Sequence, residues 1–451
     1  MQHRRLLTPV LIGLLAIAVA ACSGIAPGSQ PAATTSTSNT IPNNGLNSAT
    51  NTPSPVRSAV DQPVNLQTTP VQATPEKAHV TVWWPDELYP ANESTAADIL
   101  QSQTDLFQIT YSSYDVEIRR KRTSGTGGIL ATLRTAAPVA PSALPDLTLM
   151  QRTTMMTAAA EGLIVPLDDW VPADLAGSNL FPGTRALGVI DDSLYGIPYA
   201  LTLVHTVYRQ SIFAEPPTTF DDVLSAETPY MFSAGDLPVS WTVLLQYFAA
   251  GGRLMNDNGG AVLTPNALIT VLDYYAEGVQ RGIFNPLQLE HTNSTDYWNA
   301  FVTGEATIAS MNSHTYLTNK NTVQNVGLSS IPTEDGQSLT MLDGWMWVVT
   351  TQNPDRQQRA LAFLAWMMRV SQQSAFTESI GMIPSQTRAL RLWDDETYAD
   401  FAETLVTTAI VLPEERRNNM ATSALQDAVI AVLRGTSPET AADEALSRLG
   451  Q

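Results

Sequence analysis

The apolar and polar positions along the chain predict strands and helices that alternate from residue 79 onward. Alternating β-branched and aromatic residues indicate a strand, and apolar residues three or four positions apart indicate a helix. The predicted strands are 79–84, 116–119 and 144–150, and the predicted helices are 96–107, 128–137 and 153–162. This alternation predicts a mostly parallel, doubly wound α/β sheet. Ligands of such sheets lie beyond the carboxyl ends of the strands, which selects residues 84–87 and 150–153.

The first 77 residues follow neither pattern. Arg4 and Arg5 precede an apolar run at 6–19, which has the length of a secretory signal and is short for a transmembrane helix. From 23 to 77 the chain is dominated by Ser, Thr, Asn, Pro, Gln and Ala, so it cannot bury enough apolar surface to fold. We therefore expect a signal peptide at 1–21 and a flexible tether at 22–77.

Cys22 is the only cysteine in the chain. The run Val19-Ala20-Ala21-Cys22 resembles a bacterial lipobox, which implies cleavage before the cysteine and a diacylglyceryl group on its sulfur. The mature protein would then be anchored to the outer face of the cell membrane through the lipid on Cys22. An ordinary signal peptide with a chance cysteine and an uncleaved anchor are the alternatives. With no second thiol, the folded part needs a hydrophobic core rather than disulfides for its stability.

The charge of the chain limits the kinds of partner that it can bind. The formal net charge is −19, and we expect no nucleic acid partner because phosphate contacts need a basic surface. One basic run, Arg119-Arg120-Lys121-Arg122, stands apart from this acidic background. It predicts a solvated strand end, with an anionic-ligand site as the alternative.

The chain lacks the common motifs of hydrolases and nucleotide-binding enzymes. It has no Gly-x-Ser-x-Gly, no His-Glu-x-x-His and no P-loop. The carboxylate pairs Asp191-Asp192 and Asp394-Asp395 are adjacent in sequence, which predicts solvated turns rather than cooperating acids. The five histidines show no recurring metal-ligand spacing. We therefore expect no catalysis, no cofactor and no metal site, although a ferric ion stays an alternative if histidines converge in space.

Short motifs occur in a recognisable order between about residues 79 and 449. They are LPDL at 144–147, EGLIVPLDD at 161–169, LYGIPY at 194–199, VYR at 207–209, PPTTFDD at 216–222, FVTGEATI at 301–308, DGWMWVV at 343–349, the run 360–366 and GMIP at 381–384. In order and spacing they resemble the bacterial extracellular solute-binding proteins of ABC importers, the group that includes maltose- and other sugar-binding proteins.

This resemblance implies a periplasmic-binding-protein-like fold with two doubly wound α/β lobes, hinge crossovers and a ligand cleft between the lobes. Lobe one would hold 79–199 with 333–378, and lobe two would hold 202–331 with 384–451. The resemblance further implies a monomer that captures a carbohydrate by cleft closure and delivers it to the transmembrane subunits of an ABC permease. A sensory or scaffold lipoprotein with the same fold, or a binder of a non-sugar solute, are the alternatives.

Carbohydrate sites combine aromatic plates with carboxylate and amide partners. The candidate contacts are Trp84, Asp86, Glu87, Gln151, Arg152, Tyr199, Thr202, Trp241, Asn312, His314 and Trp345. They follow the predicted strands, mark the first crossover, precede a helix, or flank a turn expected at Gly344. His314 falls near a position where relatives often carry tryptophan, and an aromatic common in maltose binders is absent around 418–420. These departures leave a smaller sugar, a sugar derivative or another polar solute open beside an oligosaccharide.

Overall fold

The computed structural model describes residues 77–89, 94–412 and 419–451. Every described residue belongs to one compact unit within 73–451. The predictions for the signal peptide, the tether and Cys22 therefore lie outside the described residues. The boundary predicted between 77 and 79 lies within the described residues, whereas residue 418 lies outside them.

The six elements predicted before residue 163 are confirmed. The strands are β1 (Ala78–Pro85), β2 (Tyr114–Lys121) and β3 (Leu147–Gln151), and the helices are α1 (Ser94–Thr110), α2 (Ile129–Ala136) and α3 (Arg152–Ala160). A short 3₁₀ turn, η1 (Asp86–Leu88), directly follows β1. Asp191 and Asp192 form the turn predicted for them, between β4 (Val189–Ile190) and β5 (Ser193–Leu194).

The rest of the chain continues as a mixture of strands and helices. The strands are β6 (Ile197–Arg209), β7 (Tyr230–Met231), β8 (Ile308–Asn312), β9 (Val326–Ser329), β10 (Thr340–Val349), β11 (Ile383–Pro384) and β12 (Ala409–Ile410). The α-helices are α4 (Phe220–Ala226), α5 (Trp241–Ala249), α6 (Pro265–Gln280), α7 (Thr295–Thr303), α8 (Ser313–Asn319), α9 (Pro354–Met367), α10 (Val370–Ser379), α11 (Thr387–Leu390), α12 (Glu396–Val406), α14 (Met420–Leu433) and α15 (Pro438–Arg448). Shorter helical turns are η2 (Pro141–Ala143), η3 (Asp174–Ser178), η4 (Thr184–Gly188), η5 (Pro286–Glu290) and η6 (Lys320–Thr322).

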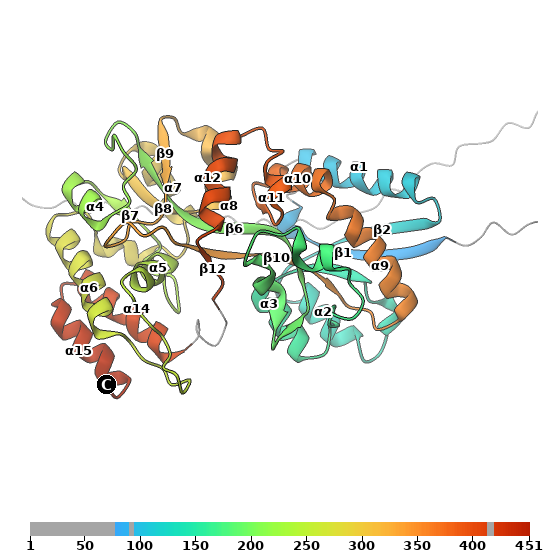
Figure 1. Cartoon of the computed structure of the whole chain (residues 1–451), viewed down its shortest axis with the longest axis horizontal. Coiled ribbons are helices and arrows are strands. Elements are labelled where there is room, and N and C mark those ends of the chain that lie inside the picture. Colours follow the sequence, from blue (N-terminus) through green and yellow to red (C-terminus); the bar gives the residue numbers. More distant parts are fainter. Residues whose placement is uncertain (1–76, 90–93, 413–418) are drawn as a thin grey trace, which may run out of the picture. The chain divides into compact units, whose positions relative to one another are not determined.

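One mixed sheet runs through the described part of the chain, in the order β2-β1-β3-β10-β6-β8-β7 (Figure 1). β1 is parallel to β2 and β3, and β7 is parallel to β8. β10 and β6, however, are antiparallel to each other, β10 is antiparallel to β3, and β6 is antiparallel to β8. The short strand β12 pairs with β10 in parallel. The prediction of a mostly parallel sheet is therefore wrong. Its reason is that β6 and β10 are long strands that cross between two parallel groups, and the local pattern of strand and helix does not reveal their direction.

The long strand β6 joins separate hydrophobic cores. Its first half pairs with β10 through Leu203, and its second half pairs with β8 from Val204 to Tyr208. Leu203 packs in the same core as Trp83, whereas Tyr208 packs in the core built by α5, α6, α14 and α15. β6 is thus a covalent connection between the two parallel groups of strands.

Helices cover both faces of the β1–β3–β10 part of the sheet. Val82, Trp84 and Trp347 point to the face covered by α1, α9 and α10, and Trp83 and Met346 point to the face covered by α2, α3 and α12. This division follows from the two-residue period of a strand. With both faces buried, the strands have apolar residues at consecutive positions.

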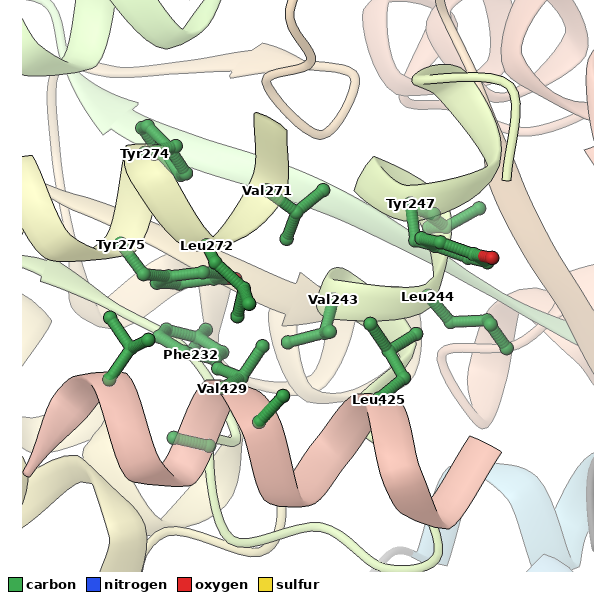
Figure 2. Packing of buried hydrophobic residues seen from close by; sticks show 14 of the residues in the cluster. Phe232, Val243, Leu244, Tyr247, Val271, Leu272, Tyr274, Tyr275, Leu425 and Val429 are labelled. Carbon is green, nitrogen blue, oxygen red and sulfur yellow. The ribbon is translucent and has the colours of Figure 1, made fainter. Parts of the chain in front are cut away.

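A second large core lies among α5, α6, α14 and α15. Figure 2 shows Leu425 and Val429 of α14 directed toward Val243 of α5 and toward Leu272 and Tyr275 of α6. The apolar residues of α14 recur three or four positions apart and therefore form one stripe on the helix. This core holds α5, whose first residue is Trp241, in a fixed position.

The turn predicted at Gly344 is wrong. Gly344 lies within β10, and its φ of 159° is extended backbone. A Cβ atom there would lie 2.3 Å from the carbonyl oxygen of Ala200 on β6. Gly344 is therefore a point of close approach between the two crossing strands, a role that only glycine can fill.

Candidate ligand-binding site

A cavity of about 620 Å³ lies where the ends of several elements meet. Its walls come from η1, β3, β6, β8, β10, α5, α8 and the start of α7, together with loop residues between them. This volume is within the range that binds small molecules. Residues from the two parallel groups of strands and from both crossing strands share the cavity.

Seven of the eleven candidate contacts line this cavity. They are Glu87, Gln151, Thr202, Trp241, Asn312, His314 and Trp345. They are distant in sequence, and the fold brings them together because β1, β3, β6, β8 and β10 belong to one sheet. Their role as ligand contacts remains a prediction.

Two candidate aromatic residues lie in the core instead of the cavity wall. Trp84 and Tyr199 are fully buried, and the Trp84 ring lies 5.5 Å from Trp347 and 5.0 Å from Phe376. Trp84 Nε1 donates a hydrogen bond to the Leu88 carbonyl oxygen at 3.2 Å. Both residues face the side of the sheet that α1, α9 and α10 cover, so packing occupies the surface that a sugar would need.

Two charged candidates also lie outside the cavity. Asp86 Oδ1 accepts hydrogen bonds from the amide of Thr123 at 3.0 Å and from its hydroxyl at 3.1 Å. Arg152 Nη1 donates to the carbonyl oxygens of Ala186 at 2.8 Å and Leu187 at 2.5 Å. Asp86 thus joins η1 to the loop after β2, and Arg152 joins α3 to η4.

The carboxyl ends of β1 and β3 supply one side of the cavity, as expected for an open α/β sheet. Glu87 lies in η1, directly after β1, and Gln151 is the last residue of β3. Gln151 Nε2 donates to Glu87 Oε2 at 3.4 Å. This pair offers a carboxylate and an amide, which can accept from and donate to the hydroxyl groups of a ligand.

Trp241 contributes an aromatic surface from another side of the cavity. It is half-buried, and it begins α5 directly after Ser240. The Ser240 amide donates to Gln426 Oε1 at 2.9 Å, and Gln426 Nε2 donates to the Ala234 carbonyl oxygen at 2.7 Å. Gln426 of α14 therefore fixes the segment that presents Trp241, without contacting the cavity itself.

Trp345 is the second tryptophan of the cavity. It lies on β10, one residue after the close approach at Gly344, and it is 4% exposed. Most of its ring therefore packs in the core, and a limited part reaches the cavity wall. Met341 of the same strand also lines the cavity.

His314 and Asn312 belong to the junction of β8 and α8. Asn312 caps α8, since its Oδ1 accepts from the His314 amide at 2.9 Å. His314 Nδ1 lies 3.2 Å from the carbonyl oxygen of Gly381. The neighbours of Gly381, Ile380 and Met382, also line the cavity. This junction therefore connects the cavity to the segment between α10 and β11.

Sequence reasoning missed a set of small hydroxyl and amide residues on the walls. They are Ser233, Ser240, Thr242, Thr292, Asn293, Ser294, Thr295, Ser310, Thr315 and Thr318. Several are joined to each other, such as Thr242 Oγ1 and Ser310 Oγ at 2.6 Å and Ser294 Oγ and Thr315 Oγ1 at 2.8 Å. Such residues are common in turns and helix caps, so their type alone gave no signal of a site.

Two properties of the described residues bear on other functions. Within 77–89, 94–412 and 419–451, no three His, Cys, Asp or Glu side chains come close enough to hold a metal ion. In the same part of the chain, none of the helices combines the length and the apolar character that crossing a bilayer requires.

Comparisons with known proteins identify the family of this chain. The sequence profile of the bacterial extracellular solute-binding proteins matches residues 107–403. A maltotriose-binding protein of Pyrococcus abyssi is 25% identical over 119 residues, which is 25% of this chain and 26% of that protein. The chain thus matches about a quarter of the length of that relative.

Solved structures share the fold at low sequence identity. The cyclic α-maltosyl-1,6-maltose binding protein of Arthrobacter globiformis has a TM-score of 0.65 at 19% identity, covering 83% of this chain and 98% of that one. The maltose-binding periplasmic protein of Listeria monocytogenes, solved with maltose, has a TM-score of 0.63 at 15% identity, covering 82% and 96%. The fold is therefore that of the periplasmic-binding-protein-like sugar-binding proteins. Because the family profile spans more than half of the sequence, the chain belongs to the bacterial extracellular solute-binding proteins.

Proposed function

We propose that this protein is the substrate-binding component of an ABC importer and that it captures a carbohydrate in the cavity. The observation that carries the proposal is the combination of Trp241 and Trp345 with walls of hydroxyl, amide and carboxylate side chains. Tryptophan faces suit the CH faces of sugar rings, and the polar side chains suit the hydroxyl groups. The similar proteins include binders of maltotriose and maltose, which supports the same class of ligand.

Capture by closure of the cavity is part of the proposal. The cavity residues lie on elements from separate cores, and β6 and β10 connect those cores. The two proposed lobes are 79–199 with 333–378 and 202–331 with 384–451. A ligand that contacts both lobes would favour the closed arrangement because its contacts are complete only there.

The remaining functional assignments follow from this role. The protein would act outside the cytoplasm as a monomer, held to the membrane by the lipid on Cys22, and would deliver its ligand to the permease subunits. Binding and release need no covalent step, so the protein would work without catalysis and without a cofactor. Metabolic labelling of the wild-type protein and of Cys22→Ser with palmitate or glycerol tests the lipid anchor.

The experiment that tests the proposed function is a thermal-shift screen of the purified protein. The probes are glucose, maltose, maltotriose, mannotriose, glucitol, glucose 6-phosphate and ferric citrate. A ligand that binds the native state raises the unfolding temperature, by an amount that grows with its concentration over Kd. Stabilisation by a saccharide supports the proposal. Stabilisation by ferric citrate alone, or by none of the probes, contradicts it.

A further inference from the structure

We propose that a second pocket beside the cavity binds one acidic group at the end of the saccharide, so that the preferred substrate is an acidic saccharide. This inference rests on the proposed function and specifies its substrate class. The pocket has a volume of about 300 Å³ and is lined by Asp86, Glu87, Arg120, Arg122, Thr123 and Ser124. Four of these residues belong to the end of β2 and the loop that follows it.

The basic run at 119–122 is divided between two sides of β2, because side chains alternate along a strand. Arg119 Nη2 forms an ion pair with Glu117 Oε2 at 2.6 Å, and Lys121 Nζ lies 4.4 Å from the centre of the Trp83 ring. Arg120 and Arg122 have the other parity, and both line the second pocket. The run is therefore more than a solvated strand end, since two of its members share a concave surface.

Arg120 and Arg122 have no carboxylate partner within the residues that the structure describes. Neither forms an ion pair within 4.0 Å there, and the Arg120 guanidinium lies 5.3 Å from the centre of the Tyr89 ring. Asp86, one of the two acidic residues that line the pocket, accepts hydrogen bonds from Thr123. The planar guanidinium groups can therefore bind a carboxylate, sulfate or phosphate through paired hydrogen bonds.

The second pocket and the cavity share Glu87. A saccharide that fills the cavity and continues past Glu87 would place its end group beside Arg120 and Arg122. The carboxylates of Asp86 and Glu87 suit neutral hydroxyl groups on the way and repel additional negative charge. The geometry thus favours a saccharide with one terminal acidic group over a polyanion.

The loop that closes the pocket is held in place by its own backbone. The Ile129 amide donates to the Arg122 carbonyl oxygen at 2.9 Å, and the Gly128 amide donates to the Gly125 carbonyl oxygen at 3.1 Å. A Cβ atom on Gly128 would lie 2.8 Å from backbone atoms of Ser124. Together with the hydrogen bonds from Thr123 to Asp86, these contacts fix the position of Arg122 relative to η1.

The test uses pairs of saccharides that differ only in the end group. Maltose, maltotriose and mannotriose are each titrated by calorimetry beside the same sugar carrying a uronic acid at its non-reducing end. We expect the acidic form to bind about fivefold more tightly than the neutral form, the size expected for a solvent-exposed charge pair. Arg120→Gln and Arg122→Gln should each abolish this preference while leaving the affinity for the neutral form unchanged. The preference should also shrink on raising NaCl from about 20 mM to about 500 mM, since salt screens exposed charges.

Arg119→Gln is the matched control, because Arg119 belongs to the same run but pairs with Glu117. It should retain the preference for the acidic form. If neutral sugars bind and the acidic forms bind no more tightly, or if Arg119→Gln has the same effect as Arg122→Gln, the second pocket is not an acid subsite and the proposed function stands. If none of these saccharides binds in either form, the acid subsite and the proposed carbohydrate function both fail.

Discussion

His314 Nδ1 lies 3.2 Å from the carbonyl oxygen of Gly381, so one side chain both lines the cavity and contacts the segment between α10 and β11. Gly381 has a φ of 62°, which side chains with a Cβ atom rarely adopt. A Cβ atom there would lie 3.0 Å from Thr318 Cγ2 and 3.3 Å from Leu317 Cβ, both on α8. Helix α8 is therefore packed closely against this connecting segment.

The first prediction concerns that close packing. Gly381→Ala should lower the free energy of unfolding by about 2 to 3 kcal/mol, because it adds a tight contact with α8 to the strain of a positive φ. Gly435→Ala is the control, since Gly435 has a φ of 97° but no atom within 4 Å of the added Cβ. It should cost only the backbone strain, about 1 to 2 kcal/mol. Denaturant unfolding measures both, and equal costs would contradict the packing described for α8.

His205, on the crossing strand β6, predicts a dependence of stability on pH. Its side chain is fully buried against Tyr316, Tyr398 and Phe401. Burial lowers the pKa of His205 to about 4, from an ordinary value of 6.5. Between these values the unfolded chain binds a proton at His205 that the folded chain does not, so stability falls as the pH falls from about 6.5 to about 4.

The expected loss over that interval is about 3 kcal/mol, following from the linkage of protonation to unfolding. The free energy of unfolding of wild type and His205→Gln should be measured by urea denaturation at several pH values. The variant is expected to be less stable at pH 7 but to lose less stability on acidification. Parallel pH profiles for the two proteins would show that His205 does not titrate as its burial requires.

Asp146 illustrates a motif residue that holds the fold. Its side chain is 2% exposed, and its Oδ2 accepts from the Thr81 amide at 2.7 Å while Arg356 Nε donates to Oδ1 at 2.5 Å. Asp146→Ala should lower stability by about 3 kcal/mol, because it leaves Arg356 and the amide without their partner.

The control for Asp146 is an exposed ion pair. Asp257 pairs with Arg253 at 2.6 Å, but its side chain is 91% exposed. Asp257→Ala should change stability by less than about 0.5 kcal/mol. Thermal unfolding of both variants provides the measurement, and a similar small effect at Asp146 would mean that its buried network contributes little.

Trp84 and its neighbour Trp83 show what the sequence could and could not indicate. The run 79–84 predicted the strand correctly, but its position at the strand end made Trp84 a candidate ligand contact. Adjacent residues of a strand point to opposite faces, and helices cover both faces here, so both tryptophans are buried. Whether a strand is covered on one face or two depends on helices distant in sequence, such as α9 and α10.

Trp84→Phe therefore tests a role in packing. It should lower the free energy of unfolding by about 2 kcal/mol, through lost contacts with Trp347 and Phe376, while changing carbohydrate affinity less than about twofold. Urea unfolding and calorimetric titration of one preparation give both quantities. A large loss of carbohydrate affinity without a loss of stability would instead indicate that Trp84 contacts the ligand.

The sequence predicted those residues of the candidate site that lie at the end of a single strand. Glu87 follows the carboxyl end of β1, Gln151 is the last residue of β3, and both line the cavity. Ser233 and Thr292, in contrast, lie on loops. The course of these loops depends on contacts between distant segments, such as the hydrogen bond from the Gly235 amide to the His291 carbonyl oxygen at 2.8 Å. The antiparallel direction of β6 and β10 likewise depends on pairing between segments about 140 residues apart.

The measurement that tests the central proposal most directly is a calorimetric titration of wild type and Trp241→Ala with the saccharide that stabilises the protein most in the screen. Trp241 is half-buried at the cavity wall, so its loss should weaken binding at least about tenfold, as expected for an aromatic anchor. Stability should fall by less than about 2 kcal/mol, since the ring is only partly packed in the core. Saturable binding to wild type that weakens in this way supports carbohydrate capture in the cavity. Unchanged affinity in a folded Trp241→Ala, or no saccharide binding to wild type, would contradict it.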